Sequence, residues 1–347
     1  MRSNPCVRVV VGASFAFVRF VERILSPSGL RRFLTPFIAT RAAFRRRQPS
    51  QPVPEFLGGA FRITKRQQRI ASLHTYLEFF PEQLGTPKWR HRLQFEGIQY
   101  LETARRQKRP VILAFCHFGP YSLLRYWLRA AGIPAATLVK GESKNRTALR
   151  RMKDRFAPFP DVPTAFHRDD ELRDAVEFLA AGNVLLTAVD IMSGKKVELF
   201  VEEHWNLWMA TGPLRMAMRQ NAEMIPCTII DQGNWHFQIR LGPPVPAPLI
   251  SSGDATLVGQ HLLDAMLPIW REHPEHCTKE FLRKFHRADS GEIFDQKKSS
   301  ANSQNWIKSG DMQVAHGATK FPLSPRERAG ACRAVASERR RMREKDA

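Results

Sequence analysis

The sequence has few cysteines, and no two of them are spaced in a way that indicates a disulfide bond or a metal site. Cysteine stands at five scattered positions: Cys6, Cys116, Cys227, Cys277 and Cys332. There is no Cys-x-x-Cys pair, and an odd, dispersed set offers no disulfide framework. Unpaired thiols are typical of proteins in reducing compartments. The sequence therefore favours the cytoplasm or the cytoplasmic face of the inner (plasma) membrane.

The sequence also lacks a hydrophobic run long enough to cross a membrane by itself. The apolar run 9–18 has about half of the roughly 20 residues that a spanning helix needs. Arg8 and Arg19 bracket it, and the continuation to Leu25 is typical of an amphipathic helix lying in the membrane interface. Two alternatives stay open: an ordinary surface helix, and a cleaved signal peptide, although Arg-Phe-Val-Glu stands where a cleavage site needs small residues.

Acidic residues are scarce. The chain has 33 of them against 54 lysines and arginines, so its formal net charge is +21. The charge is densest over residues 1–47, where Glu22 is the one acid among ten arginines. Such a segment suits an anionic lipid, an acidic protein or a nucleic acid. The arginines form no nucleic-acid motif and are not interleaved with stacking aromatics, so we expect no specific nucleic-acid partner.

Composition divides the chain into four segments. Residues 1–47 are predicted to be a basic, amphipathic membrane-anchoring segment, and residues 48–94 a Pro-rich linker with a helical lead-in. Residues 95–287 have the apolar content of a folded domain. Residues 288–347 lack periodicity and are predicted to be a basic, disordered tail.

Strand and helix patterns alternate within the folded segment. Strands are predicted over 110–115, 135–139, 184–189 and 224–230, with helices over 121–131, 171–181, 211–221 and 261–270. A further strand over 235–240 is expected to pair antiparallel with 224–230. This order predicts an α/β fold with a mostly parallel mixed sheet and helices on both faces. Sites in such folds form at the carboxyl edge of the strands, where His117, Glu142 and Asp190 are expected to emerge.

His117 stands on a short loop between a predicted buried strand and a helix. The strand end fixes its backbone while the loop leaves its ring open, which suits a general base. Its position alone also fits a structural, partly buried histidine.

Several modest motifs then occur in a characteristic order, and together they resemble the lipid A biosynthesis lauroyl/myristoyl acyltransferase family. They cover roughly residues 95–287 and comprise the segments Phe95–Leu101, Lys108–Leu113, His117–Gly119, Asp190–Gly194 followed by Phe200-Val201, Thr211–Pro213, Ala222–Pro226 and His273–His276. The resemblance implies a glycerolipid-acyltransferase-like fold. It also implies a membrane-associated enzyme that moves a fatty acyl group from acyl carrier protein or coenzyme A to a hydroxyl of a lipid acceptor, without a cofactor.

The family's catalytic signature is a histidine with an acid five residues later, and here that fifth residue is Ser122. A serine hydroxyl can accept a hydrogen bond but cannot stabilise an imidazolium as a carboxylate does. Three outcomes are open. Glu142 or Asp190 replaces the missing acid, the enzyme is slow or acts on a more acidic nucleophile, or the fold serves as a non-catalytic lipid- or carrier-binding protein.

The remaining candidates each have a structural alternative. The resemblance suggests that substrate contacts lie at Gly119, Ser122, Arg155, Gly194 and Thr211. Arg155 could instead be a solvated surface charge, and Asp190 could instead cap the turn that follows it. Cys116 is expected to be a core thiol. We expect no metal site, because His273 and His276 have no further ligand at suitable spacing and Pro274 interrupts their helix.

Overall fold

The computed structural model describes residues 5–43, 54–58, 73–141, 163–191, 193–202 and 205–287. By its contacts the chain divides into two units, Met1–Gln296 and Lys297–Ala347, and all described residues belong to the first. Glu142 and Arg155 lie outside the described residues, as does the predicted tail 288–347.

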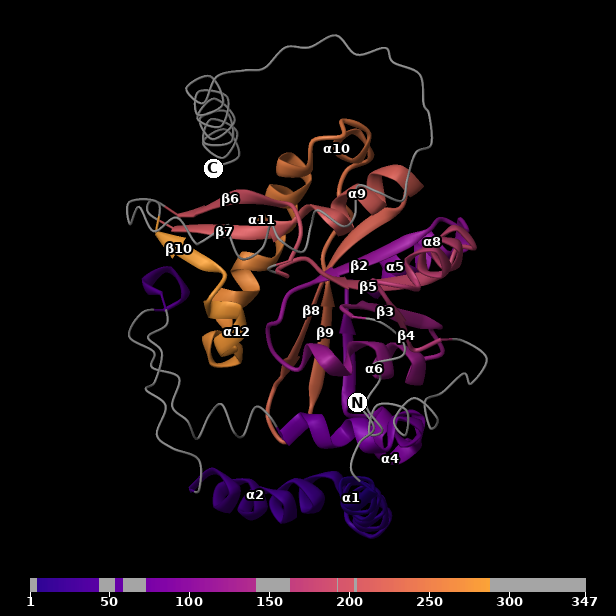
Figure 1. Cartoon of the computed structure of the whole chain (residues 1–347), viewed down its shortest axis with the longest axis vertical. Helices are drawn as coiled ribbons and strands as arrows, with labels where there is room; N and C mark the ends of the chain where they lie inside the picture. Colours follow the sequence, from indigo (N-terminus) through magenta and orange to yellow (C-terminus); the bar gives the residue numbers. More distant parts are fainter. Residues whose placement is uncertain are drawn as a thin grey trace. The chain divides into compact units, whose positions relative to one another are not determined.

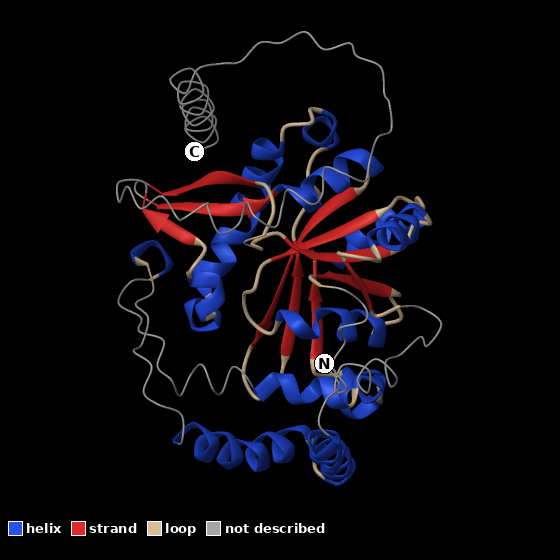
Figure 2. Ribbon diagram, in the orientation of Figure 1, coloured by secondary structure: helices blue, strands red, loops and turns tan. Residues whose placement is uncertain are grey.

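A seven-stranded sheet forms the centre of the first unit (Figures 1 and 2), in the order β1-β9-β8-β2-β5-β3-β4. The strands β8, β2, β5, β3 and β4 run parallel, while β9 runs antiparallel to β8 and parallel to β1 at one edge. The predicted mostly parallel α/β sheet is therefore confirmed. The bounds are β1 (Leu93–Glu96), β2 (Val111–Phe115), β3 (Ala135–Val139), β4 (Ala165–His167), β5 (Val184–Ala188), β8 (Glu223–Asp231) and β9 (Phe237–Leu241).

Helices cover both faces of this sheet because its central strands are apolar on both sides. Alternate residues of β2 divide between two cores: Ile112 and Ala114 in one, Val111 and Leu113 in the other. The first core includes α8 (Leu172–Ala180), α9 (Thr211–Gln220), α10 (Ala247–Ser251) and α11 (Ala255–Glu272). The second includes α4 (Pro87–Arg90), α5 (Ile98–Arg106) and α6 (Leu124–Ala130), with 3₁₀ turns at Leu73–Phe79, Pro81–Gly85 and Tyr121–Leu123.

A second, three-stranded sheet lies beside α11 and α12 (Lys279–Leu282) in Figure 1. It pairs β6 (Lys196–Glu202) with β7 (Trp205–Ala210) and β7 with β10 (Phe285–Arg287), all antiparallel. None of its three strands was predicted from the sequence. β7 is the central strand of this sheet, with β6 and β10 at its edges.

The N-terminal residues form two helices, α1 (Pro5–Ile24) and α2 (Pro27–Ala43), that pack on the second core. Glu22 is buried in this contact. Its carboxylate accepts a hydrogen bond from Trp89 Nε1 at 2.8 Å and pairs with Lys88 Nζ at 2.9 Å. One face of α1 is thus attached to the α/β body. No helix in the described part of the chain is both long and apolar enough to cross a bilayer.

Candidate active site

Two neighbouring strands deliver the central pair of side chains. His117 follows β2 by two residues and Asp190 follows β5 by two residues. The two strands are parallel, with Phe115 opposite Ala188, so both side chains emerge at the same level of the carboxyl edge. His117 Nδ1 lies 2.7 Å from Asp190 Oδ1, and the His117 backbone N–H donates to Asp190 Oδ2 at 2.9 Å. One carboxylate therefore fixes both the ring and the backbone of His117.

The environment of this pair favours a charged imidazole. Asp190 is fully buried, and about 15% of the His117 side chain is exposed. Burial of the ring opposes its protonation, but the hydrogen bond and charge of Asp190, with the charge of Glu280, outweigh burial and raise the pKa of His117. The carboxylate only accepts hydrogen bonds, so in the neutral imidazole Nδ1 carries the proton and Nε2 keeps the lone pair.

Two further side chains hold the histidine loop. Thr278 precedes α12, and its hydroxyl donates to the His117 carbonyl at 2.7 Å. The Tyr121 ring packs edge-on against the imidazole, with 4.6 Å between ring centroids. Burial and the charges of Glu280, Asp190 and Glu78 raise the pKa of Tyr121 to about 12. Its phenol therefore stays protonated at neutral pH.

Ser122 does not take the place of the missing acid. Its Oγ is buried and has no hydrogen-bond partner among the described residues, so it makes no hydrogen bond with His117. The carboxylate on His117 comes instead from Asp190, 73 residues further along the chain.

Gly119 is constrained by packing. Its φ is +60°, and a Cβ there would lie 2.3 Å from the carbonyl oxygen of Ile229 in β8. Its N–H donates to the His276 carbonyl at 3.0 Å. The close approach at Gly119 is therefore to β8, and its N–H already donates to the protein backbone.

The loop after Asp190 is closed by backbone contacts. Thr211 begins α9, and both its N–H (3.0 Å) and its hydroxyl (3.2 Å) donate to the Lys195 carbonyl. Gly194 is exposed, with a φ of +87° that favours glycine. Both residues shape the loop that follows Asp190.

Cys116 lies next to His117 in sequence but belongs to the first core, as predicted. Burial, followed by the negative charge of Asp190, raises the pKa of its thiol well above the usual value. A protonated, buried thiol is a poor nucleophile.

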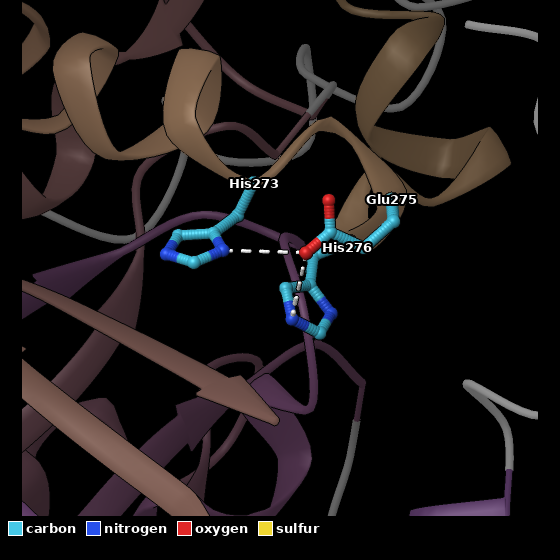
Figure 3. Close-up of side chains that lie close together, drawn as sticks. All are labelled: His273, Glu275 and His276. Carbon is cyan, nitrogen blue, oxygen red and sulfur yellow. Dashed lines mark hydrogen bonds and ion pairs between the residues drawn. The ribbon is translucent and has the colours of Figure 1, made fainter. Parts of the chain in front are cut away.

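A second group of histidines lies next to the loop that carries His117, because the carbonyl of His276 accepts the Gly119 N–H. Figure 3 shows Glu275 between His273 and His276, with Glu275 Oε1 at 3.2 Å from His273 Nδ1 and 3.8 Å from His276 Nε2. Burial lowers the pKa of His276, outweighing the opposite effect of Glu275. Among the described residues, this is the set of histidine, cysteine and acidic side chains close enough to bind a metal ion together. From the sequence, no further ligand was expected beside His273 and His276, but Glu275 lies close enough to be a third.

Comparison with known proteins identifies the family of the chain. Residues 71–275 match the bacterial lipid A biosynthesis acyltransferase family, which is more than half of the chain. The chain belongs to this family. A search of curated proteins returns no match. The family match contains β1 to β9 with His117 and Asp190, whereas α12 and β10 follow its end.

Some residues near the site escaped sequence reasoning. Thr278 has the pattern of an N-cap, since its hydroxyl also accepts a hydrogen bond from the Phe281 N–H at 3.0 Å, and that pattern was available. Tyr121 gave no signal beyond lying near His117. Lys196 and Lys284 lie in or beside the small sheet that the sequence analysis missed.

Proposed function

We propose that the chain is a membrane-associated acyltransferase that moves a fatty acyl group from a thioester of acyl carrier protein or coenzyme A to a hydroxyl of a lipid acceptor. The observation that carries the proposal is the 2.7 Å contact between His117 Nδ1 and the buried Asp190. It supplies the base-orienting carboxylate that Ser122 does not provide. The family membership supplies the reaction class.

In this mechanism His117 is the general base and Asp190 is the positioning residue. His117 Nε2 takes the proton of the acceptor hydroxyl, and the hydroxyl oxygen attacks the thioester carbonyl. The tetrahedral intermediate collapses with loss of the thiolate, which receives the proton from Nε2, so an ester and a free thiol result. Asp190 stabilises the imidazolium during these steps.

Acyl transfer from labelled acyl carrier protein to membrane lipid tests the role of His117. We expect His117→Ala to lower transfer by about 10³-fold or more, because the proton of the hydroxyl then has no positioned acceptor. His91→Ala removes an exposed imidazole elsewhere and is the matched control. Equal transfer by His117→Ala and wild type would remove His117 from the chemistry. Binding of carrier and lipid without any transfer by the wild type would favour the non-catalytic alternative.

Membrane association is proposed through α1. Its inner face packs on the body through Phe15, Val18 and Val21, while Phe17, Phe20 and Ile24 are 48%, 61% and 65% exposed. Large exposed apolar side chains beside arginines are typical of helices that lie in a lipid interface. We infer attachment to the cytoplasmic face of the inner membrane.

Flotation with anionic vesicles tests this attachment. Phe17→Ser with Phe20→Ser removes the two exposed rings, and we expect at least about ten-fold weaker binding because their apolar area no longer enters the lipid. Leu257→Ser, which removes an exposed apolar residue of α11, is the matched control. Equal binding by all three proteins would contradict the role of α1.

A further inference from the structure

Lys196 lies close to the end of the strand that carries Asp190. It is the first residue of β6 and is paired in register with Ala210, the last residue of β7. The Ala210 N–H donates to the Val189 carbonyl at 2.7 Å, one residue before Asp190. This backbone path brings Lys196 to the carboxyl edge of the large sheet, where His117 also lies.

Lys284 approaches the same edge from the other side. Its carbonyl accepts a hydrogen bond from the Trp208 N–H of β7 at 3.4 Å, and it follows the short helix that begins beside Thr278. Thr278 in turn holds the His117 carbonyl. Lys284 is only 4% exposed, and its charge acts to lower the pKa of His117. A nearly buried ammonium group is thus part of the surroundings of the proposed base.

Within the described ranges one of the two lysines, Lys284, forms an ion pair, and that contact is long. Lys284 Nζ is 3.9 Å from Glu280 Oε1, and the Glu280 side chain is 59% exposed. Lys196 forms no ion pair there, and its Nζ lies 6.0 Å from the centroid of the Trp208 ring. Burial and then the charge of Lys284 lower the pKa of Lys196, so the two ammonium groups repel each other. One long ion pair to a largely exposed carboxylate matches this pair of positive charges only in part, and a bound anion would offset the rest.

We propose that Lys196 and Lys284 form a subsite for a phosphate group of a substrate, next to His117. The inference rests on the proposed function for its role in acyl transfer, but the anion site is defined by the lysines themselves. A phosphate ester is the expected ligand because it offers several oxygens to ammonium donors. Both substrates can carry one: the lipid acceptor in its headgroup, and the donor in the phosphopantetheine arm that bears the thioester.

Binding of inorganic pyrophosphate to the full-length protein tests the subsite without any turnover. We expect saturable binding to the wild type, with an upward shift of the His117 pKa followed by NMR, because an anion nearby favours the imidazolium. The double variant Lys196→Met with Lys284→Met is expected to bind at least about ten-fold more weakly, as lost hydrogen bonds to charged groups predict. Lys195→Met, which removes an exposed lysine next to Lys196, is the control and is expected to bind like the wild type.

Lys196→Met alone tests the same subsite without altering the nearly buried Lys284, so the result does not depend on whether the double variant folds. Equal pyrophosphate binding by wild type and by the folded lysine variants overturns the subsite, whatever the transfer assay gives. Binding that depends on the lysines, in a protein that transfers no acyl group, leaves the subsite standing and refutes the proposed function instead.

Comparing KM for substrates with and without their phosphate group shows which substrate supplies the phosphate. If the acceptor supplies it, removal of the phosphates of a lipid A-type acceptor by phosphatase raises KM at least about ten-fold in the wild type and has little effect in the lysine variants. If the donor supplies it, the same difference appears between acyl-phosphopantetheine and acyl-pantetheine. If KM is the same for the two acceptors and also for the two donors, the subsite has no role in transfer.

Discussion

Two pairs of histidine and carboxylate lie near the loop that carries His117, and they differ in how buried the carboxylate is and how closely it contacts the ring. His117 meets Asp190, which is fully buried and makes two hydrogen bonds to it. His276 meets Glu275, whose side chain is 42% exposed and whose nearest oxygen is 3.8 Å from Nε2. The Gly119 N–H joins the groups by donating to the His276 carbonyl.

The difference teaches that the burial and contact distance of the carboxylate decide in which direction the pKa of each histidine shifts. The pKa of His117 is raised although its ring is buried, because Asp190 contacts it directly. The pKa of His276 is lowered, because burial of its ring outweighs a distant and solvated carboxylate. A base that becomes cationic during a reaction needs the first kind of partner.

Removal of the Asp190 charge is expected to give the largest effect. Asp190→Asn keeps the shape of the side chain but no longer stabilises the imidazolium, so we expect kcat to fall by about 10⁴-fold, as in a comparable histidine–carboxylate pair. Glu275→Gln is the matched control, with an expected change below about three-fold because the Glu275 side chain is 42% exposed and its contacts are with His273 and His276. Transfer by Asp190→Asn within ten-fold of wild type would show that another group orients His117.

Breaking the link between the two groups is expected to affect stability next. Gly119→Ala places a Cβ against the Ile229 carbonyl at a positive φ, so we expect a loss of about 2–4 kcal/mol in the free energy of unfolding. Gly132→Ala, also at a positive φ but with no neighbour within 4 Å of the added Cβ, separates backbone strain from the clash. Denaturant unfolding measures both, and equal losses would rule out the contact with β8 as the cause.

The two histidines are expected to give stability contributions of opposite pH dependence. The folded pKa of His117 is raised, so its contribution is fully present below about pH 6.5 and is lost as the pH rises through the folded pKa. The folded pKa of His276 is lowered, so its contribution is present above about pH 6.5 and is lost as the pH falls through the folded pKa.

Unfolding free energies of wild type, His117→Gln and His276→Gln, measured between about pH 5 and 8.5, show these signs directly. The difference between wild type and His117→Gln should shrink toward high pH, and that between wild type and His276→Gln toward low pH. The neutral form of His117 is the base, so kcat should also rise with pH through a pKa above the usual value. A common sign for both histidines would contradict the comparison.

The smallest effect is expected from chelation. His273, Glu275 and His276 are close enough to bind an ion, but Glu275 already contacts a ring nitrogen of His273 and the proposed mechanism uses no metal. We expect EDTA to change transfer and melting temperature by less than the error of the measurement. Loss of activity with EDTA that zinc restores, and that His276→Gln abolishes, would show a metal site.

Long, strongly patterned elements could be predicted from the sequence. The strand predicted over 135–139 is β3 without change, and the helix predicted over 211–221 is α9 but for its last residue. The strands of the small sheet could not, because β6, β7 and β10 owe their pairing to one another and to α11 rather than to local periodicity. Pro226 lies inside β8, where it has no N–H to donate and its carbonyl accepts the Gly242 N–H.

The sequence by itself determined that a histidine follows a buried strand at the carboxyl edge of a mostly parallel sheet, and that acids follow two other strands of that sheet. Which acid meets His117 was decided by the tertiary structure alone. Strand β5 neighbours β2, whereas β3 lies on the far side of β5, so Asp190 is the acid delivered to the imidazole. Strand order depends on how helices pack over both faces of the sheet, and no local pattern of residues encodes it.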